Sequence, residues 1–226
     1  MAGFAAGSFA GAAGSLAGAA AQIPSASSSV VSDGFATLGR IHLAWRGPPP
    51  LHADAAALEV LAAAWSQPGT GALWKRLVYE LQLAQRLSVW TVSHRLGTEL
   101  HLTVDVRSDV APQRVEDELA TALAHLRAEP FEAAALARVA ARREAAMLWS
   151  LQSISRRAAD LQRHLYWYGE PNGYGVELAR VRAVDSQAVA AATRWLSTAG
   201  CLSVRTEPRG QRAASATPQE SEDAGS

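Results

Sequence analysis

The amino-acid sequence predicts an α+β fold: a mixed, largely antiparallel sheet with helices packed on one face. Some segments alternate apolar and polar residues, which is typical of half-buried strands. Other segments repeat apolar residues every three or four positions, which is typical of amphipathic helices. The predicted order is a strand, two helices, two strands, several helices and a last strand. Because strands and helices do not alternate strictly, a doubly wound parallel sheet is disfavoured.

The first predicted strand runs from Ile41 to Trp45, where apolar residues alternate with His42 and a small residue. The proline-rich turn at 47–50 ends it, because proline has no N–H to donate to a strand ladder. A helix is then expected over 52–65.

The segment 71–89 predicts a second helix that leads directly into a strand. Leu73, Leu77 and Leu81 fall on one helix face, and alternation begins at Leu87. A turn at Gly97 separates this strand from the clearest one in the sequence.

The clearest strand is the run from Leu100 to Val106, in which four apolar residues alternate with polar ones. Together with the strand before it, this run predicts a β-hairpin with one face buried.

Four helices and a last strand are expected in the second half. The helices are predicted over 112–128, 132–165, 176–181 and 186–196, and the strand over Cys201–Arg205. The longest helix has an apolar seam. Its members are Leu136, Ala140, Met147, Leu151, Ile154, Ala158, Leu161 and Leu165.

Composition and charge set the limits of the domain. The 226 residues include 21 basic and 21 acidic ones, so no global attraction to nucleic acid or acidic membranes is expected. Residues 1–37 are rich in Ala, Gly and Ser and predict a disordered leader or linker, and 209–226 predict a disordered polar tail. The domain is therefore expected over 38–208.

The compartment stays open between cytoplasm and periplasm, with a soluble protein expected. No Lys or Arg precedes Arg40, so the positive region of a signal peptide is missing. No apolar run approaches the roughly 18 to 20 residues of a membrane span.

Motifs for independent chemistry are absent from the sequence. Neither the zinc-binding motif H-E-x-x-H nor its inversion H-x-x-E-H occurs, and no G-x-S-x-G turn is present. His42 and His101 are predicted to be solvated on polar strand faces. The single cysteine, Cys201, is predicted to be a buried small hydrophobe with an inert thiol.

Three groups of polar or aromatic residues stand out, and two of them leave two interpretations each. Glu116, Asp117 and Glu118 favour a solvated helix face. Arg138, Arg142, Arg143, Arg156 and Arg157 favour solvated faces too, with a polar groove for an acidic partner as the alternative. Tyr166, Trp167, Tyr168 and Tyr174 fit packing within the domain or a partner surface.

Four segments resemble the second, non-catalytic domain of the pitrilysin/insulinase family of zinc metallopeptidases, to which the mitochondrial processing peptidases belong. They are RIHLAWRGPPPLHADAAALEVLAAAW from Arg40, GALWKRLVYELQLAQRLSV from Gly71, ISRRAADL from Ile154 and AVDSQAVAAATRWLS from Ala183. The resemblance covers about residues 38–208. It implies one of two homologous domains in half of a clamshell that encloses an unfolded peptide.

The resemblance also implies that zinc is bound elsewhere. In the family, an H-x-x-E-H motif on the catalytic half supplies two zinc ligands and the glutamate that activates water. This sequence has no equivalent. We therefore expect no catalytic residue, metal ligand or cofactor in this chain, and zinc only in a catalytic partner.

Many family members carry an arginine, and seven residues later a tyrosine, that bind the substrate backbone and help to stabilise the oxyanion. The matching positions here are Val78 and Gln85, and valine cannot donate a hydrogen bond. The peptide contacts that remain as candidates are Lys75, Arg76, Tyr79 and Arg86.

The leading hypothesis is a non-catalytic domain or subunit of such a peptidase, which holds peptide by strand addition to a sheet edge beside an H-x-x-E-H partner. A catalytically inert binding or scaffold protein of the same fold is the second. A truncated gene product is the third.

Overall fold

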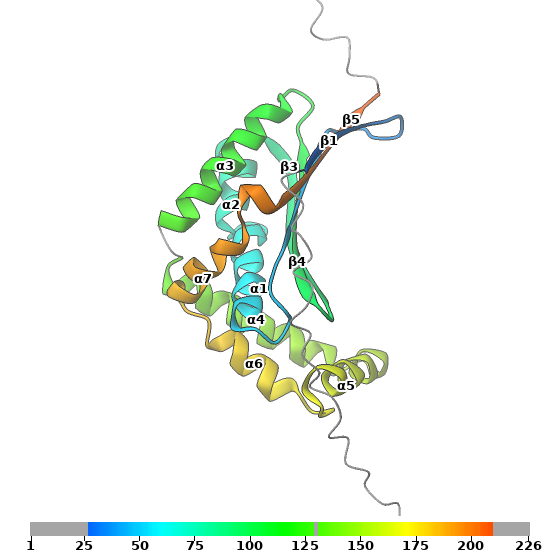
Figure 1. Ribbon diagram of the computed structural model, residues 1–226, viewed down its shortest axis with the longest axis vertical. Coiled ribbons are helices and arrows are strands. Elements are labelled where there is room, and N and C mark those ends of the chain that lie inside the picture. Colours follow the sequence, from blue (N-terminus) through cyan, green and yellow to red (C-terminus); the bar gives the residue numbers. More distant parts are fainter. Residues whose placement is uncertain (1–26, 129–130, 210–226) are drawn as a thin grey trace, which may run out of the picture.

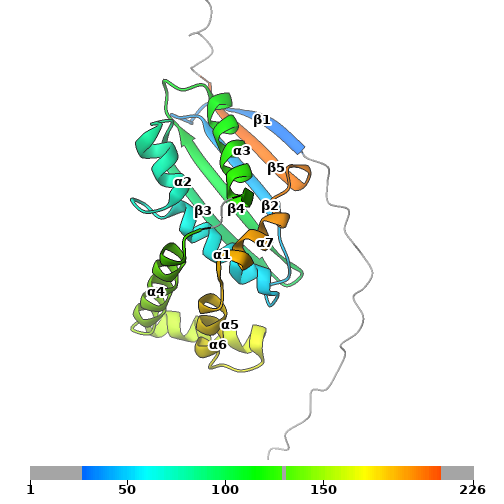
Figure 2. The same ribbon diagram turned by 90° about the vertical axis from the view of Figure 1, so that its left-hand side faces the viewer.

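A five-stranded sheet forms one layer of the protein, helices lie against one of its faces, and further helices extend beyond one end of the sheet (Figures 1 and 2). The structure, a computed structural model, describes residues 27–128 and 131–209. The strands lie in the order β1-β5-β2-β4-β3. They are β1 Ser27–Asp33, β2 Arg40–Arg46, β3 Ala84–His94, β4 Gly97–Val106 and β5 Cys201–Pro208.

The sheet is mixed and largely antiparallel, as the sequence predicts. β2 pairs antiparallel with β4 and β5, β3 pairs antiparallel with β4, and β1 pairs parallel with β5. Within the described residues, β3 and β1 are therefore the two edges of the sheet.

Strand β1 corrects the expected domain boundary. It lies inside the segment 1–37, which the sequence predicted to be a disordered leader, yet it pairs with β5 along its whole length. Its sequence SSSVVSD is exposed on nearly every residue, so it lacks the alternation of a half-buried strand. The predictions for residues 1–26 and for 210–226 lie outside the described residues.

Helices of the first half of the chain cover the face of the sheet that carries the core. Leu100, Leu102, Val104 and Val106 of β4 are buried there, while the residues between them face the other side. The helices are α1 Ala53–Ser66, α2 Ala72–Trp74, η1 Lys75–Glu80, α3 Pro112–Ala128, α4 Ala133–Ser150, α5 Ile154–Tyr168, α6 Tyr174–Arg182, α7 Ser186–Ala192, η2 Thr193–Trp195 and η3 Thr198–Gly200.

The long helix predicted over 132–165 is wrong, because α4 and α5 are separate helices. Ser153 is the N-cap of α5, and its hydroxyl accepts the backbone N–H of Arg156. A serine cap satisfies a backbone donor that a continuing helix would bond to its own carbonyl. The apolar seam is buried only near its start, at Leu136, whereas Ile154 and Leu165 are 83% and 54% exposed.

The predicted helix-to-strand segment has an unusual turn. η1 is a π-helix, in which the N–H of Leu81 reaches the carbonyl of Arg76, five residues back. Leu73 and Leu77 are buried as expected. Gln82 then adopts the left-handed conformation, with φ of 52°, where the chain reverses into β3.

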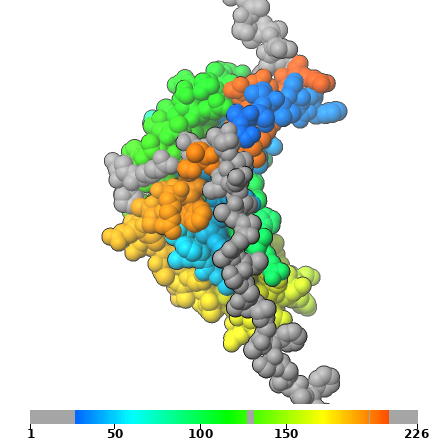
Figure 3. All heavy atoms as spheres, in the orientation of Figure 1, coloured from blue at the N-terminus to red at the C-terminus, as the bar shows by residue number. Residues whose placement is uncertain are grey.

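The described part of the molecule is elongated. Figure 3 shows β1 and β5 (blue and orange-red) together at one end of the body and α6 (yellow) at the other. Among the helices of residues 27–128 and 131–209, none has both the length and the apolar composition needed to cross a membrane.

Candidate functional site

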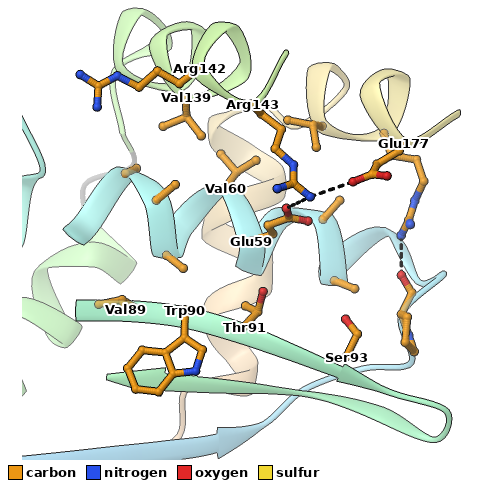
Figure 4. A pocket seen from close by; sticks show the side chains of 18 of the residues that line it. Glu59, Val60, Val89, Trp90, Thr91, Ser93, Val139, Arg142, Arg143 and Glu177 are labelled. Carbon is orange, nitrogen blue, oxygen red and sulfur yellow. Dashed lines mark hydrogen bonds and ion pairs between the residues drawn. The ribbon is translucent and has the colours of Figure 1, made fainter. Parts of the chain in front are cut away.

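A groove of about 610 Å³ opens beside the edge strand β3 (Figure 4). β3 forms one wall, α4 forms the opposite wall, and α1 lies between them as the floor. Residues of α5 and α6 also line it. The groove therefore runs along a sheet edge to which, in the described part of the chain, no further strand is added.

The floor of the groove carries mostly small side chains, apart from Glu59 and Val60. Ala55, Ala56, Ala62, Ala63 and Ser66 of α1 all line it. Alanine is a strong helix former and projects only a methyl group. A ligand chain can therefore approach the backbone of α1 closely.

The backbone of β3 presents hydrogen-bonding groups to this groove. Thr98 of β4 donates its N–H to the Pro48 carbonyl and accepts the Gly47 N–H with its own carbonyl, and both partners lie just after β2. The backbone N–H and C=O groups of even-numbered β4 residues therefore point toward β2. The backbone groups of odd-numbered β4 residues point toward β3, where His101 is paired with Trp90. Trp90 and the other even-numbered residues of β3 therefore point their backbone groups toward β4. Both backbone groups of an antiparallel residue point to the same side.

Val89, Thr91 and Ser93 consequently turn their N–H and C=O groups outward. The Ser66 hydroxyl lies 3.3 Å from the Val89 carbonyl oxygen, which confirms this orientation. The same hydroxyl has a shorter bond, 2.8 Å, to the Ala62 carbonyl. An incoming strand can therefore take the Val89 carbonyl without leaving Ser66 unsatisfied.

A charged network closes the end of the groove near α6. Arg143 of α4 bonds Glu59 at 2.8 Å and Glu177 at 2.7 Å, so it ties α4 to α1 and α6 (Figure 4). Arg163 and the fully buried His164 also bond Glu177, at 2.9 and 3.0 Å. Burial opposes ionisation of Glu177, but the bonds from His164 and Arg163 outweigh it and lower its pKa.

The aromatic cluster predicted at 166–174 divides between the two expected roles. Tyr168 and Tyr174 pack on the His164 ring, with centroids 5.8 and 4.5 Å away. Trp167 lines the groove, and Tyr166 is exposed. Gly173 lies so close that a Cβ there would be 2.5 Å from the Tyr168 ring.

The predicted arginines also divide. Arg138, Arg142 and Arg143 line the groove, whereas an acidic partner for it stays a prediction. Arg156 and Arg157 of α5 are exposed and lie outside it.

A sequence model of the peptidase M16 inactive domain matches residues 18–142. The chain belongs to this family. The M16 match covers more than half of the sequence and bears out the predicted resemblance to a non-catalytic peptidase domain. No curated protein sequence matches the chain significantly.

Solved structures share the fold of this M16 domain at low sequence identity. A protease from Helicobacter pylori superimposes with a TM-score of 0.74 at 16% identity, covering 82% of this chain and 45% of that one. An inactive peptidase domain from Bordetella parapertussis superimposes with a TM-score of 0.67 at 17% identity, covering 82% of this chain and 95% of that one. An M16 inactive domain from Pseudomonas fluorescens superimposes with a TM-score of 0.64 at 16% identity, covering 82% of this chain and 44% of that one. The chain thus spans less than half of two of these proteins.

The four candidate peptide contacts lie outside the groove of the M16 domain. Lys75, Arg76 and Tyr79 are exposed on η1, and Arg86 is exposed near the start of β3. Arg76 forms ion pairs with Glu80 and Glu118, at 3.4 and 3.5 Å. Their role in peptide binding remains a prediction.

The two positions that replace the family's arginine and tyrosine have different surroundings. Val78 packs against the core, and Gln85 is exposed at a bulge in β3. At position 78, where the family's arginine would donate a hydrogen bond, valine instead contributes apolar packing to the core.

His42 and His101 correct a further prediction, because they are half-buried and not solvated. Their rings lie 3.1 Å apart, nitrogen to nitrogen, on the sheet face opposite the helices, and Trp90 stacks on both. Burial, followed by the charges of His101 and Arg40, lowers the pKa of His42. Sequence patterning missed this contact because it joins residues 59 positions apart.

Other titratable residues indicate no metal or nucleophile. Within residues 27–128 and 131–209, no group of three or more His, Cys, Asp or Glu could hold a metal ion. Cys201 is half-buried, not fully buried as predicted, and packs against the core. Desolvation raises the pKa of its thiol to about 11, which favours the protonated form near neutral pH. In the acidic cluster, Glu116 and Glu118 pair with Arg205 and Arg76, and Asp117 is exposed.

Proposed function

We propose that this M16 inactive domain holds an extended peptide along the outer edge of β3, as one wall of a chamber completed by an H-x-x-E-H catalytic partner. The observation that carries the proposal is the outward-facing backbone of Val89, Thr91 and Ser93 beside a groove with a small-residue floor. Strand addition gains affinity from backbone hydrogen bonds and places alternate side chains in pockets.

Binding by backbone hydrogen bonds can be tested with N-methylated peptides. We would titrate the full chain with nine-residue peptides methylated at either of the two alternate sets of amides. One set must face β3, so methylating it removes binding, while the other set faces away and tolerates methylation. Equal binding of both methylated peptides would refute the strand-addition proposal.

A substitution in β3 gives the matching test on the protein. Thr91→Pro removes an outward N–H that β4 does not use, and proline is tolerated at such edge positions. Thr91→Val keeps the N–H and serves as the control. We expect weaker peptide binding only for the proline variant, with circular dichroism showing that both variants fold.

An exposed apolar surface on α5 supports the proposal of a catalytic partner. On α5, Ile154, Leu161 and Leu165 follow one face at helical spacing and are 83, 36 and 54% exposed. Such a stripe normally faces another element. Because the chain spans 45% of the Helicobacter protein with the same fold, a second domain of similar size is the proposed occupant.

This partner proposal is tested by mixing the chain with a homologous M16 protein that carries the H-x-x-E-H motif. We expect a one-to-one complex by ultracentrifugation and zinc-dependent peptide cleavage by the mixture. Ile154→Lys should weaken the complex, whereas Arg156→Gln, exposed on the same helix outside the stripe, should not.

Failure of the unsubstituted chain to form the complex would favour the second candidate, an inert binding or scaffold protein of the same fold. The residues that favour this candidate are Val78 and Gln85, which replace the family's arginine and tyrosine.

A further inference from the structure

We propose that the groove selects extended peptides with acidic side chains at alternate positions, and that Arg138 and Arg142 of α4 recognise these side chains. This inference rests on the proposed strand addition to β3 and adds the chemical class of the peptide.

The charge of the groove differs from that of the chain. Five arginines and two glutamates line it, an excess of three positive charges, whereas the whole chain has a formal net charge of zero. The charged lining residues are Glu59, Arg138, Arg142, Arg143, Arg163, Glu177 and Arg180. A groove with one dominant sign of charge concentrates ligands of the opposite sign.

Both glutamates are already paired within the protein. Arg143 bonds Glu59 and Glu177, and Arg163 bonds Glu177 as well. Arg180 is also engaged, since it donates to the backbone carbonyls of Pro50 and His52 at 2.7 and 3.0 Å. These residues therefore build the groove and are less available to a peptide.

Arg138 and Arg142 are the arginines left for a ligand. Both are exposed on α4 and line the groove. In the described part of the chain, neither forms an ion pair or a side-chain hydrogen bond. The guanidinium group is always charged and matches a carboxylate with two parallel hydrogen bonds.

The spacing of these two arginines suits an extended chain. Four helical residues advance about 6 Å along the axis of α4. Alternate residues of a strand are about 7 Å apart and share one face. A peptide added to β3 projects every second side chain toward the helix layer, where α4 forms the far wall (Figure 4). Two carboxylates at positions i and i+2 can therefore meet the two guanidinium groups.

The test is a fluorescence-polarisation titration of the full chain with three nine-residue peptides. They are identical except that alternate positions carry glutamate, glutamine or lysine. Arg138→Gln, Arg142→Gln and the double variant are compared with Arg114→Gln, an exposed helix arginine on α3 outside the groove.

We expect the glutamate peptide to bind more tightly than the glutamine peptide, and the lysine peptide most weakly. Each groove substitution should weaken glutamate-peptide binding about three-fold and the double variant about ten-fold, as for solvent-accessible ion pairs. The glutamine peptide should be unaffected. Raising salt from about 0.05 to about 0.5 M should remove most of the preference.

Three outcomes would overturn the inference. Equal binding of the three peptides that remains sensitive to N-methylation would refute acidic selection but leave the proposed strand addition standing. No binding of any peptide would refute both. Tighter binding after removal of residues 210–226, which contain Glu220 and Glu222, would assign the groove to the chain's own acidic tail.

Discussion

Single residues in this domain connect elements that the sequence keeps far apart. Glu177 accepts bonds from α4 and α5 while it belongs to α6, and its carboxylate is buried. His164 is held in the same place, because its Nδ1 accepts the Gly173 N–H at 3.2 Å and its Nε2 lies 3.0 Å from the Glu177 carboxylate. The position of the α5–α6 corner thus depends on one acidic side chain.

Replacement of Glu177 by alanine should lower the free energy of unfolding by about 2 kcal/mol, because buried His164 and two arginines lose a charged acceptor. Urea denaturation provides the measurement. Glu80→Ala removes an exposed partner of Arg76 and should change stability by less than about 0.5 kcal/mol. Similar losses in the two variants would contradict the structural role of Glu177.

His42, on the sheet face opposite the helices, should make stability depend on pH. The pKa of His42 is lowered in the folded state, so below about pH 6.5 the unfolded chain binds more protons. Its contribution is present above that pH and is lost as pH falls toward the folded pKa. In urea denaturation between about pH 7.5 and 5, His42→Gln should reduce the pH dependence. An equal reduction by His94→Gln, an exposed histidine of the same sheet, would contradict this explanation.

At the scale of elements, the junction of α1 and α2 depends on close backbone contact. Gly71 is buried, and a Cβ there would lie 2.4 Å from the Trp65 carbonyl oxygen and 2.6 Å from the Gln67 nitrogen. Neither backbone atom can move without disturbing the end of α1, which forms the groove floor. The turn into η1 and β3 therefore requires glycine.

Gly71→Ala should destabilise the fold by about 2 to 3 kcal/mol, since backbone must shift to admit the methyl group. Gly175 of α6 is the control, because a Cβ there meets no atom within 4 Å. Gly175→Ala should leave stability unchanged or raise it by up to about 1 kcal/mol. Thermal unfolding of the two variants would decide, and a stable Gly71→Ala chain would count against the contact.

At the scale of the whole molecule, the domain has a groove beside β3 and, among the described residues, no group of side chains that could hold a metal ion. The two surfaces proposed to bind a peptide and a partner are distinct. The groove lies at the β3 edge, and the exposed apolar stripe lies on α5. A peptide and a partner could therefore be bound together.

The chain alone should neither retain zinc nor hydrolyse peptides. Metal analysis after dialysis should find well under one zinc per chain, and a quenched fluorescent peptide should stay intact during incubation with it. Stoichiometric zinc, together with cleavage that chelators inhibit, would refute the non-catalytic assignment.

The fold class was predictable because strands and helices leave different periodicities. In β4 the alternation from Leu100 to Val106 matches its buried face, and the bounds of α3 agree with the prediction. β1 and the break at Ser153 were not predictable in this way. An exposed edge strand has no alternation, and a serine within an amphipathic pattern can either continue a helix or cap a new one.

The sequence by itself determined the family and the absence of its zinc motif, because both depend on residue identity in a fixed order. Only the tertiary structure decided which arginines share a groove, that β3 is an edge of the sheet formed by the described residues, and that His42 meets His101. These contacts join residues far apart in the chain. Their geometry depends on how strands pair and helices pack, and local patterns do not record it.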